Sequence, residues 1–98
     1  MNISVKGVKV SVSQSMKEDF VSRVSLLCEK YFGKVISATV SLELDHADKV
    51  EAKITVHPAE KKEFFSSASA DQMKDAFADA LTKLDSQLNK DHAKSAKH

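Results

Sequence analysis

The sequence has little of the residues that interrupt or cross-link a chain: its 98 residues include two glycines, one proline and one cysteine. So little glycine and proline argues against repeats, flexible linkers or a second domain, and residues 1–98 are expected to form one domain. The single cysteine, Cys28, excludes an internal disulfide, and no apolar run approaches the roughly 18 residues of a membrane span. The N-terminal residues also lack an apolar run with a cleavage site, so no signal peptide is expected. These absences predict a cytoplasmic protein with no membrane partner.

The sequence also lacks a strong excess of either charge and the usual motifs of catalysis. Its net charge is +1, so any nucleic-acid binding must come from a local basic patch. The four histidines show no metal-ligand spacing with one another or with Cys28, and no glycine-rich loop or nucleophile-elbow serine is found. We therefore expect a protein that is not an enzyme and holds neither a metal nor a cofactor.

Apolar residues that alternate with polar ones predict four strands. The alternation covers residues 2–12, 35–44, 50–57 and 63–70, and the first of these strands has a candidate bulge at Gly7. In residues 35–44 and 50–57 one face is apolar and the other is polar, which is typical of a sheet with one buried face and one solvated face.

Apolar residues spaced three and four apart predict two amphipathic helices. The first begins at a serine cap, either Ser13 or Ser15, and carries Cys28 on its apolar side. The second extends from about Asp71 to about Lys90. Beyond it, residues 91–98 are expected to form a basic, frayed tail.

The predicted element order is β-α-β-β-β-α. A strand–helix–strand crossover favours parallel neighbours, whereas the short turns between the later strands make those strands antiparallel. Both helices therefore leave the same edge of the sheet, run parallel and cover its single apolar face. The expected fold is α+β, with a four-stranded mixed sheet and two parallel helices on one face, as in double-stranded RNA-binding domains.

Basic residues gather toward the C-terminal ends of both predicted helices. At 100° per residue they form two groups, which are Arg23, Lys30 and Lys34 on the first helix and Lys83, Lys90, Lys94 and Lys97 on the second. Because the helices are parallel, the groups lie at one end of the domain, where they could form one surface across both helices. Three interpretations remain open: compensation of the helix dipoles at about 0.3–1 kcal/mol per charge, phosphate binding, or binding of an acidic protein partner.

The polar face of the sheet is a second candidate surface. Its predicted members are Lys53, Thr55, His57, Phe65 and Ser67. An exposed aromatic ring beside basic and hydroxyl groups could stack on a nucleobase. A lone apolar residue on a solvated face is, however, the commoner explanation for Phe65.

Residues 71–90, DQMKDAFADALTKLDSQLNK, resemble the signature of the ribosome hibernation-promoting factors, a family that includes the ribosome-associated inhibitor and was once labelled sigma-54 modulation proteins. The family pattern is Asp-Met-Tyr-x-Ala-Ile followed by x-x-Lys-Leu-x-x-Gln-Leu-x-Lys. Its positions are occupied here by Met73, Ala76, Phe77, Lys83, Leu84, Gln87, Leu88 and Lys90. This chain departs from the pattern at Lys74, where tyrosine is usual, and at Ser86, where a basic residue is common.

The resemblance implies a β-α-β-β-β-α fold and a function. Members of that family bind the rRNA of the small ribosomal subunit near the decoding region and silence the ribosome in stationary phase or stress. Short members favour ribosome dimers, often with a separate ribosome modulation factor, and this chain resembles the short kind. The matched positions assign rRNA contacts to Arg23, Lys34, Lys83, Lys90 and Lys94.

The helix pattern and the resemblance together give seven candidate rRNA-binding residues: Arg23, Lys30, Lys34, Lys83, Lys90, Lys94 and Lys97. The isolated protein is expected to be a monomer. The alternative hypothesis is a protein-interaction module that uses the open sheet face or a sheet edge.

Overall fold

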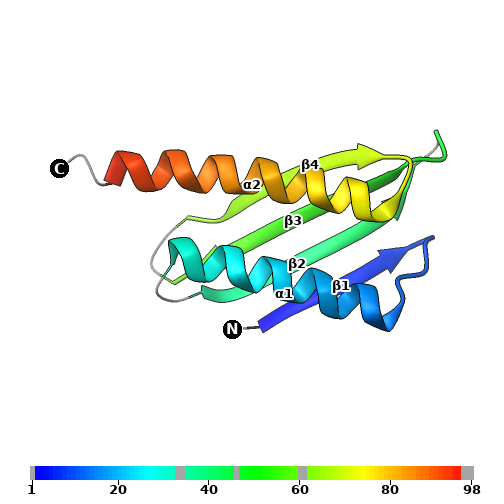
Figure 1. The fold of residues 1–98 in the computed structure, drawn as a ribbon, viewed down its shortest axis with the longest axis horizontal. Coiled ribbons are helices and arrows are strands. Elements are labelled where there is room, and N and C mark those ends of the chain that lie inside the picture. The colour runs from blue at the N-terminus through cyan, green and yellow to red at the C-terminus, as the bar shows by residue number, and fades with distance from the viewer. Residues whose placement is uncertain (1, 33–34, 46, 60–61, 96–98) are drawn as a thin grey trace.

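A computed structural model describes residues 2–32, 35–45, 47–59 and 62–95, and its elements follow the predicted order (Figure 1). These elements are β1 (Asn2–Val8), α1 (Gln14–Tyr31), β2 (Val35–Leu44), β3 (Val50–Pro58), β4 (Phe64–Ala70) and α2 (Met73–Ser95). Ser13 rather than Ser15 caps α1, because its Oγ accepts a hydrogen bond from the Met16 N–H at 3.2 Å.

The four strands form one sheet in the order β1-β2-β3-β4. β1 pairs with β2 in parallel, and β2–β3 and β3–β4 pair antiparallel. Both helices lie on one face of the sheet and run in the same direction, with α1 over β1 and β2 and α2 over β3 and β4 (Figure 1). The predicted fold class is confirmed, and β1 and β4 are the two edges of the sheet.

The core fills the space between the helices and the sheet. The strands contribute alternate buried residues, which are Ala38, Val40 and Leu42 on β2, Ala52, Ile54 and Val56 on β3, and Phe64 and Ala68 on β4. Phe20 of α1 stacks on Phe77 of α2 with ring centroids 4.1 Å apart, so the two helices meet through this pair. Ser66 is buried among these residues, and its hydroxyl donates a 2.8 Å hydrogen bond to the Ala80 carbonyl.

The first strand is shorter than predicted. Lys9 has a φ of 61°, which turns the chain away after Val8, so Val10 and Val12 lie outside the strand and pack partly against the core. The pairing of β1 with β2 continues through Gly7 without a shift, so the predicted bulge is wrong.

The second helix starts later and ends later than predicted. It begins at Met73 rather than Asp71, since the Ala76 N–H bonds to the Gln72 carbonyl at 3.0 Å. It continues past Lys90 to Ser95. The added turn contains neither glycine nor proline, and alanine and lysine favour helix, so nothing in it stops the helix.

Gly7 is required by a close backbone approach. A Cβ at this position would lie 2.4 Å from the Val10 carbonyl oxygen and 3.1 Å from a Val12 methyl carbon. We expect Gly7→Ala to lower the free energy of unfolding by about 1–3 kcal/mol, because the turn after β1 must shift to make room. Urea unfolding measures this change. Ser4→Ala, at an exposed site on the same strand, should change it by less than about 0.5 kcal/mol, and equal effects would contradict the steric explanation.

Cys28 is a buried thiol, and burial raises its pKa from 9.0 to about 11. Between about pH 9 and pH 11, the Cys28 thiol therefore keeps its proton in the folded state, whereas the same thiol has lost it in the unfolded chain. The resulting stabilisation is complete below about pH 9 and is lost as the pH rises toward 11, with a total of up to about 2–3 kcal/mol. The difference in unfolding free energy between the wild type and Cys28→Ala should shrink by this amount between about pH 8 and pH 11. A difference that stays constant with pH would contradict the prediction.

Candidate nucleic-acid interface

Arg23 and Lys30 project from α1 into the groove between the helices. They line a hollow of about 310 Å³ whose apolar wall includes Leu26 and Leu81. Each cation already has an acidic partner. The Arg23 Nε lies 3.1 Å from an Asp19 carboxylate oxygen, and the Lys30 Nζ lies 3.7 Å from Asp85. The groove therefore presents partly neutralised cations.

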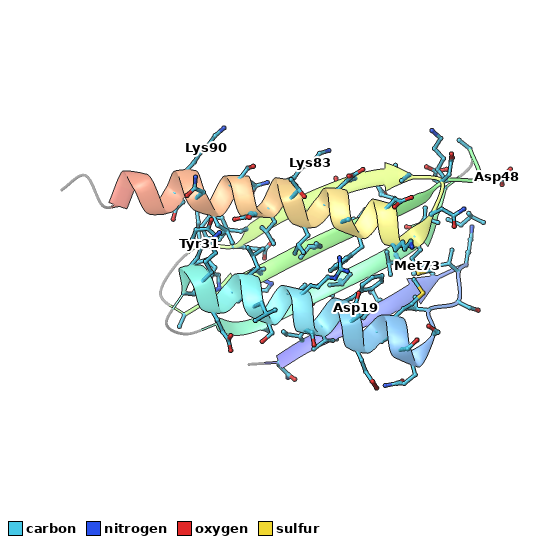
Figure 2. The ribbon with its side chains drawn as sticks, in the orientation of Figure 1. Asp19, Tyr31, Asp48, Met73, Lys83 and Lys90 are labelled. Carbon is cyan, nitrogen blue, oxygen red and sulfur yellow. The ribbon has the colours of Figure 1, made fainter. Side chains whose placement is uncertain are left out.

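Tyr31 and Asp85 tie the C-terminal half of α1 to α2. The Tyr31 hydroxyl donates a 2.5 Å hydrogen bond to Asp85 Oδ1, and Tyr31 lies between the two helices (Figure 2). The Lys30 ammonium lies 5.1 Å from the centre of the Tyr31 ring. The hydrogen bond with Tyr31, followed by the Asp85 charge, raises the pKa of Lys30, so this lysine stays charged at neutral pH. The hydrogen bond to Asp85, followed by desolvation, raises the pKa of Tyr31.

Lys83 and Lys90 lie on the flank of α2 that is opposite to the groove between the helices. Figure 2 shows both side chains pointing away from α1. The Lys83 Nζ donates to the Ser67 carbonyl of β4 at 3.2 Å. Lys90 lines a hollow of about 330 Å³ beside the start of β4, together with Lys62 and Phe65 and with the acidic side chains of Glu63 and Asp91. Within the part of the chain that the structure describes, Lys90 makes no ion pair.

The structure thus forms two basic surfaces. The inner groove holds Arg23 and Lys30, and the outer flank holds Lys83 and Lys90, with α2 between them. Lys34 and Lys97 lie outside the described residues, as does the side chain of Lys94.

Three side chains of these surfaces were not predicted. Lys62 joins the outer flank because the β3–β4 turn brings it there, with its Nζ 5.8 Å from the centre of the Phe64 ring. Gln87, one turn after Lys83, donates a 2.8 Å hydrogen bond from its amide to the Phe65 carbonyl. Asp85 pairs with Lys30 across the helices. The spacing of Gln87 four residues after Lys83 is the one sequence signal that places these two side chains on the same flank.

The sheet face away from the helices is rich in hydroxyl groups. The register places Lys6, Ser41, Lys53 and Ser67 in one row across the four strands, and Ser4, Thr39, Thr55 and Phe65 in the next. Phe65 is 48% exposed, as the alternation predicted. An acidic partner reduces the positive charge here, since Lys53 lies 3.5 Å from Glu51, and the His57 imidazole lies 3.2 Å from Glu63.

The turn between β2 and β3 is stabilised by an acidic side chain. Asp45 acts in this turn, where its Oδ1 accepts hydrogen bonds from the N–H groups of Ala47 and Lys49 at 2.8 and 3.0 Å.

Among the described residues, no group of histidine, cysteine and acidic side chains is placed to hold a metal ion. In the same part of the chain, neither helix is long and apolar enough to cross a membrane.

Comparison with solved structures shows the same fold in proteins of low sequence identity. The N-terminal domain of Protein Y from Thermus thermophilus matches with a TM-score of 0.78 and 20% identity, covering 92% of this chain and 98% of that domain. A ribosomal subunit interface protein from Coxiella burnetii matches with a TM-score of 0.80 and 19% identity, covering 95% of this chain and 99% of that protein. No curated protein sequence gives a significant match. A family model for the sigma 54 modulation protein / S30EA ribosomal protein matches residues 3–96, and the chain therefore belongs to that family.

Proposed function

We propose that this protein binds the small ribosomal subunit through its rRNA and blocks translation there, without catalysing a reaction. The observation that carries the proposal is the family match over residues 3–96, because the family is named for a ribosomal protein. A protein of the same fold from Coxiella burnetii is described as a ribosomal subunit interface protein, which supports a site between subunits.

Phosphate contacts from the two basic surfaces would supply the binding energy. Lys83 and Lys90 on the outer flank, with Arg23 and Lys30 in the groove, all lie on the helical side of the molecule. Arg23 is the only arginine in the sequence, and lysine binds phosphate as a point charge without the fork geometry of arginine. Recognition would therefore follow the shape and charge of the rRNA rather than individual bases.

The mechanism we propose is steric occlusion. A domain held near the decoding region of the small subunit would exclude messenger and transfer RNA and would keep the ribosome inactive in the cytoplasm during stationary phase or stress. We further propose that the free protein is a monomer. Promotion of ribosome dimers, with a separate ribosome modulation factor as partner, is part of the same hypothesis.

Sedimentation of a lysate on sucrose gradients tests this function. We expect the protein to move with the small subunit or the whole ribosome at about 50 mM salt and to leave it steeply as salt rises, with a slope of log K on log salt near −0.7 to −0.9 per phosphate contact. Stationary-phase ribosomes should give the largest bound fraction. A protein that stays at the top of the gradient under all of these conditions would overturn the proposal.

Exposure of Phe65 favours a second candidate, a protein-interaction module that uses the open sheet face. Phe65 and the hydroxyl rows beside it offer a surface of low net charge for a protein partner. Binding of this kind would depend little on salt and would be weakened by Phe65→Ala rather than by loss of lysines.

A further inference from the structure

The β4 edge of the sheet has no protection within its own strand. An edge strand offers unpaired N–H and C=O groups to other chains, and proteins usually place lysine or proline on it to prevent pairing. β4 reads FFSSASA, with no charged residue and no proline or glycine, whereas the opposite edge strand β1 carries Lys6. A segment of this composition favours pairing with another strand.

The protection comes instead from α2. The Lys83 Nζ donates to the Ser67 carbonyl at 3.2 Å, and the Gln87 amide donates to the Phe65 carbonyl at 2.8 Å. Phe65 and Ser67 are alternate residues of the strand, so their backbone groups point to the same side, away from β3. Two successive carbonyls that a new strand would use are therefore occupied by helix side chains.

We propose that the β4 edge is a pairing surface for a second copy of this chain, and that Lys83 and Gln87 keep it closed in the free protein. In an antiparallel self-pairing with Ser66 on the two-fold axis, Phe65 of each copy lies opposite Ser67 of the other. Glu63 then lies opposite Ser69, so no like charges face each other along the strands.

The geometry selects a closed dimer. A two-fold pairing of β4 joins two four-stranded sheets into one and leaves only the β1 edges at its ends. With the guarding side chains in place, the two Lys83 ammonium groups would approach each other across the joint, which opposes pairing. Pairing along β4 depends on these contacts and not on ribosome binding, so loss of one would leave the other unaffected.

The test is the double variant Lys83→Ala/Gln87→Ala, studied by size exclusion with light scattering from micromolar to near-millimolar concentration. We expect the wild type to keep its monomer mass of 10.8 kDa and the variant to form a species of twice that mass. Gln72→Ala/Lys74→Ala makes the same change in composition at the start of α2, where Gln72 immediately precedes the helix, and should stay monomeric. A wild type that dimerises equally, or a variant that is folded by circular dichroism but monomeric, would overturn the proposal.

Two further measurements locate the contact. Hydrogen exchange at the Phe65 and Ser67 amides, which point to solvent in the monomer, should slow in the double variant. Adding Ser67→Pro should restore the monomer, because proline removes an outward N–H that β3 does not use. A dimer that persists with this proline, or whose two amides still exchange rapidly, would place the interface elsewhere and refute the β4 pairing.

Discussion

Replacing Phe77 with alanine should lower the free energy of unfolding by about 3–5 kcal/mol, the largest change expected for a single substitution in this protein. Phe77 is fully buried, and its ring stacks on Phe20 at 4.1 Å, so the substitution removes both the buried ring and the contact that joins α1 to α2. A domain of this size has a total stability of about 5–15 kcal/mol, so this loss is a large fraction of it. Urea unfolding followed by circular dichroism measures the loss.

Two comparisons identify the source of this loss of stability in Phe77→Ala. Leu26→Ala, at a side chain that is 67% exposed, should change stability by less than about 1 kcal/mol. A double-mutant cycle of Phe20→Ala and Phe77→Ala should give a coupling of about 0.5–1.5 kcal/mol beyond the burial of each ring. A loss below about 1 kcal/mol in the Phe77 variant would mean that the cavity collapses or that the stack contributes nothing.

Periodicity predicted the order of the elements because each has a long apolar face. The alternation in β2 and β3 and the three- and four-residue steps in both helices correspond directly to buried side chains. The end of β1 was predicted wrongly because Val8, Val10 and Val12 continue the β-branched pattern past Gly7. The turn depends on the left-handed backbone of Lys9 and the close approach at Gly7, and neither is visible as a residue pattern.

The candidate site was less predictable than the fold. Helical spacing correctly placed Lys83 and Lys90 on one side of α2, yet it could not tell whether that side faces α1 or the free edge of the sheet. The answer depends on which strands each helix covers, and the order β1-β2-β3-β4 puts α2 over the β4 edge. The same limit hid the contact between Lys83 and the Ser67 carbonyl, since hydrogen bonds to backbone leave no mark in the sequence.

Neutralising four cations should produce the largest change in ribosome binding. The variant Arg23→Gln/Lys30→Gln/Lys83→Gln/Lys90→Gln removes the described cations of both surfaces. If each contributes one phosphate contact, the magnitude of the slope of log K on log salt should decrease by about 3. Affinity at about 50 mM salt should fall about a thousandfold or more. The slope is measured from bound fractions on gradients at several salt concentrations. A matched control, Lys17→Gln/Lys74→Gln, lies at the opposite ends of the same helices and should change the slope little.

The two halves of this variant should not contribute equally. Arg23 and Lys30 already have acidic partners at 3.1 and 3.7 Å, so RNA must compete with Asp19 and Asp85, and their loss should flatten the slope by less than the pair's full share of about 1.4–1.8. Lys83→Gln/Lys90→Gln should account for most of the change, since Lys90 has no ion pair among the described residues. The mass of this pair variant must be measured alongside binding, because Lys83 also guards the β4 edge and a dimer would alter the apparent affinity. A larger change from the inner pair in a monomeric protein would place the RNA in the groove between the helices rather than along the outer flank.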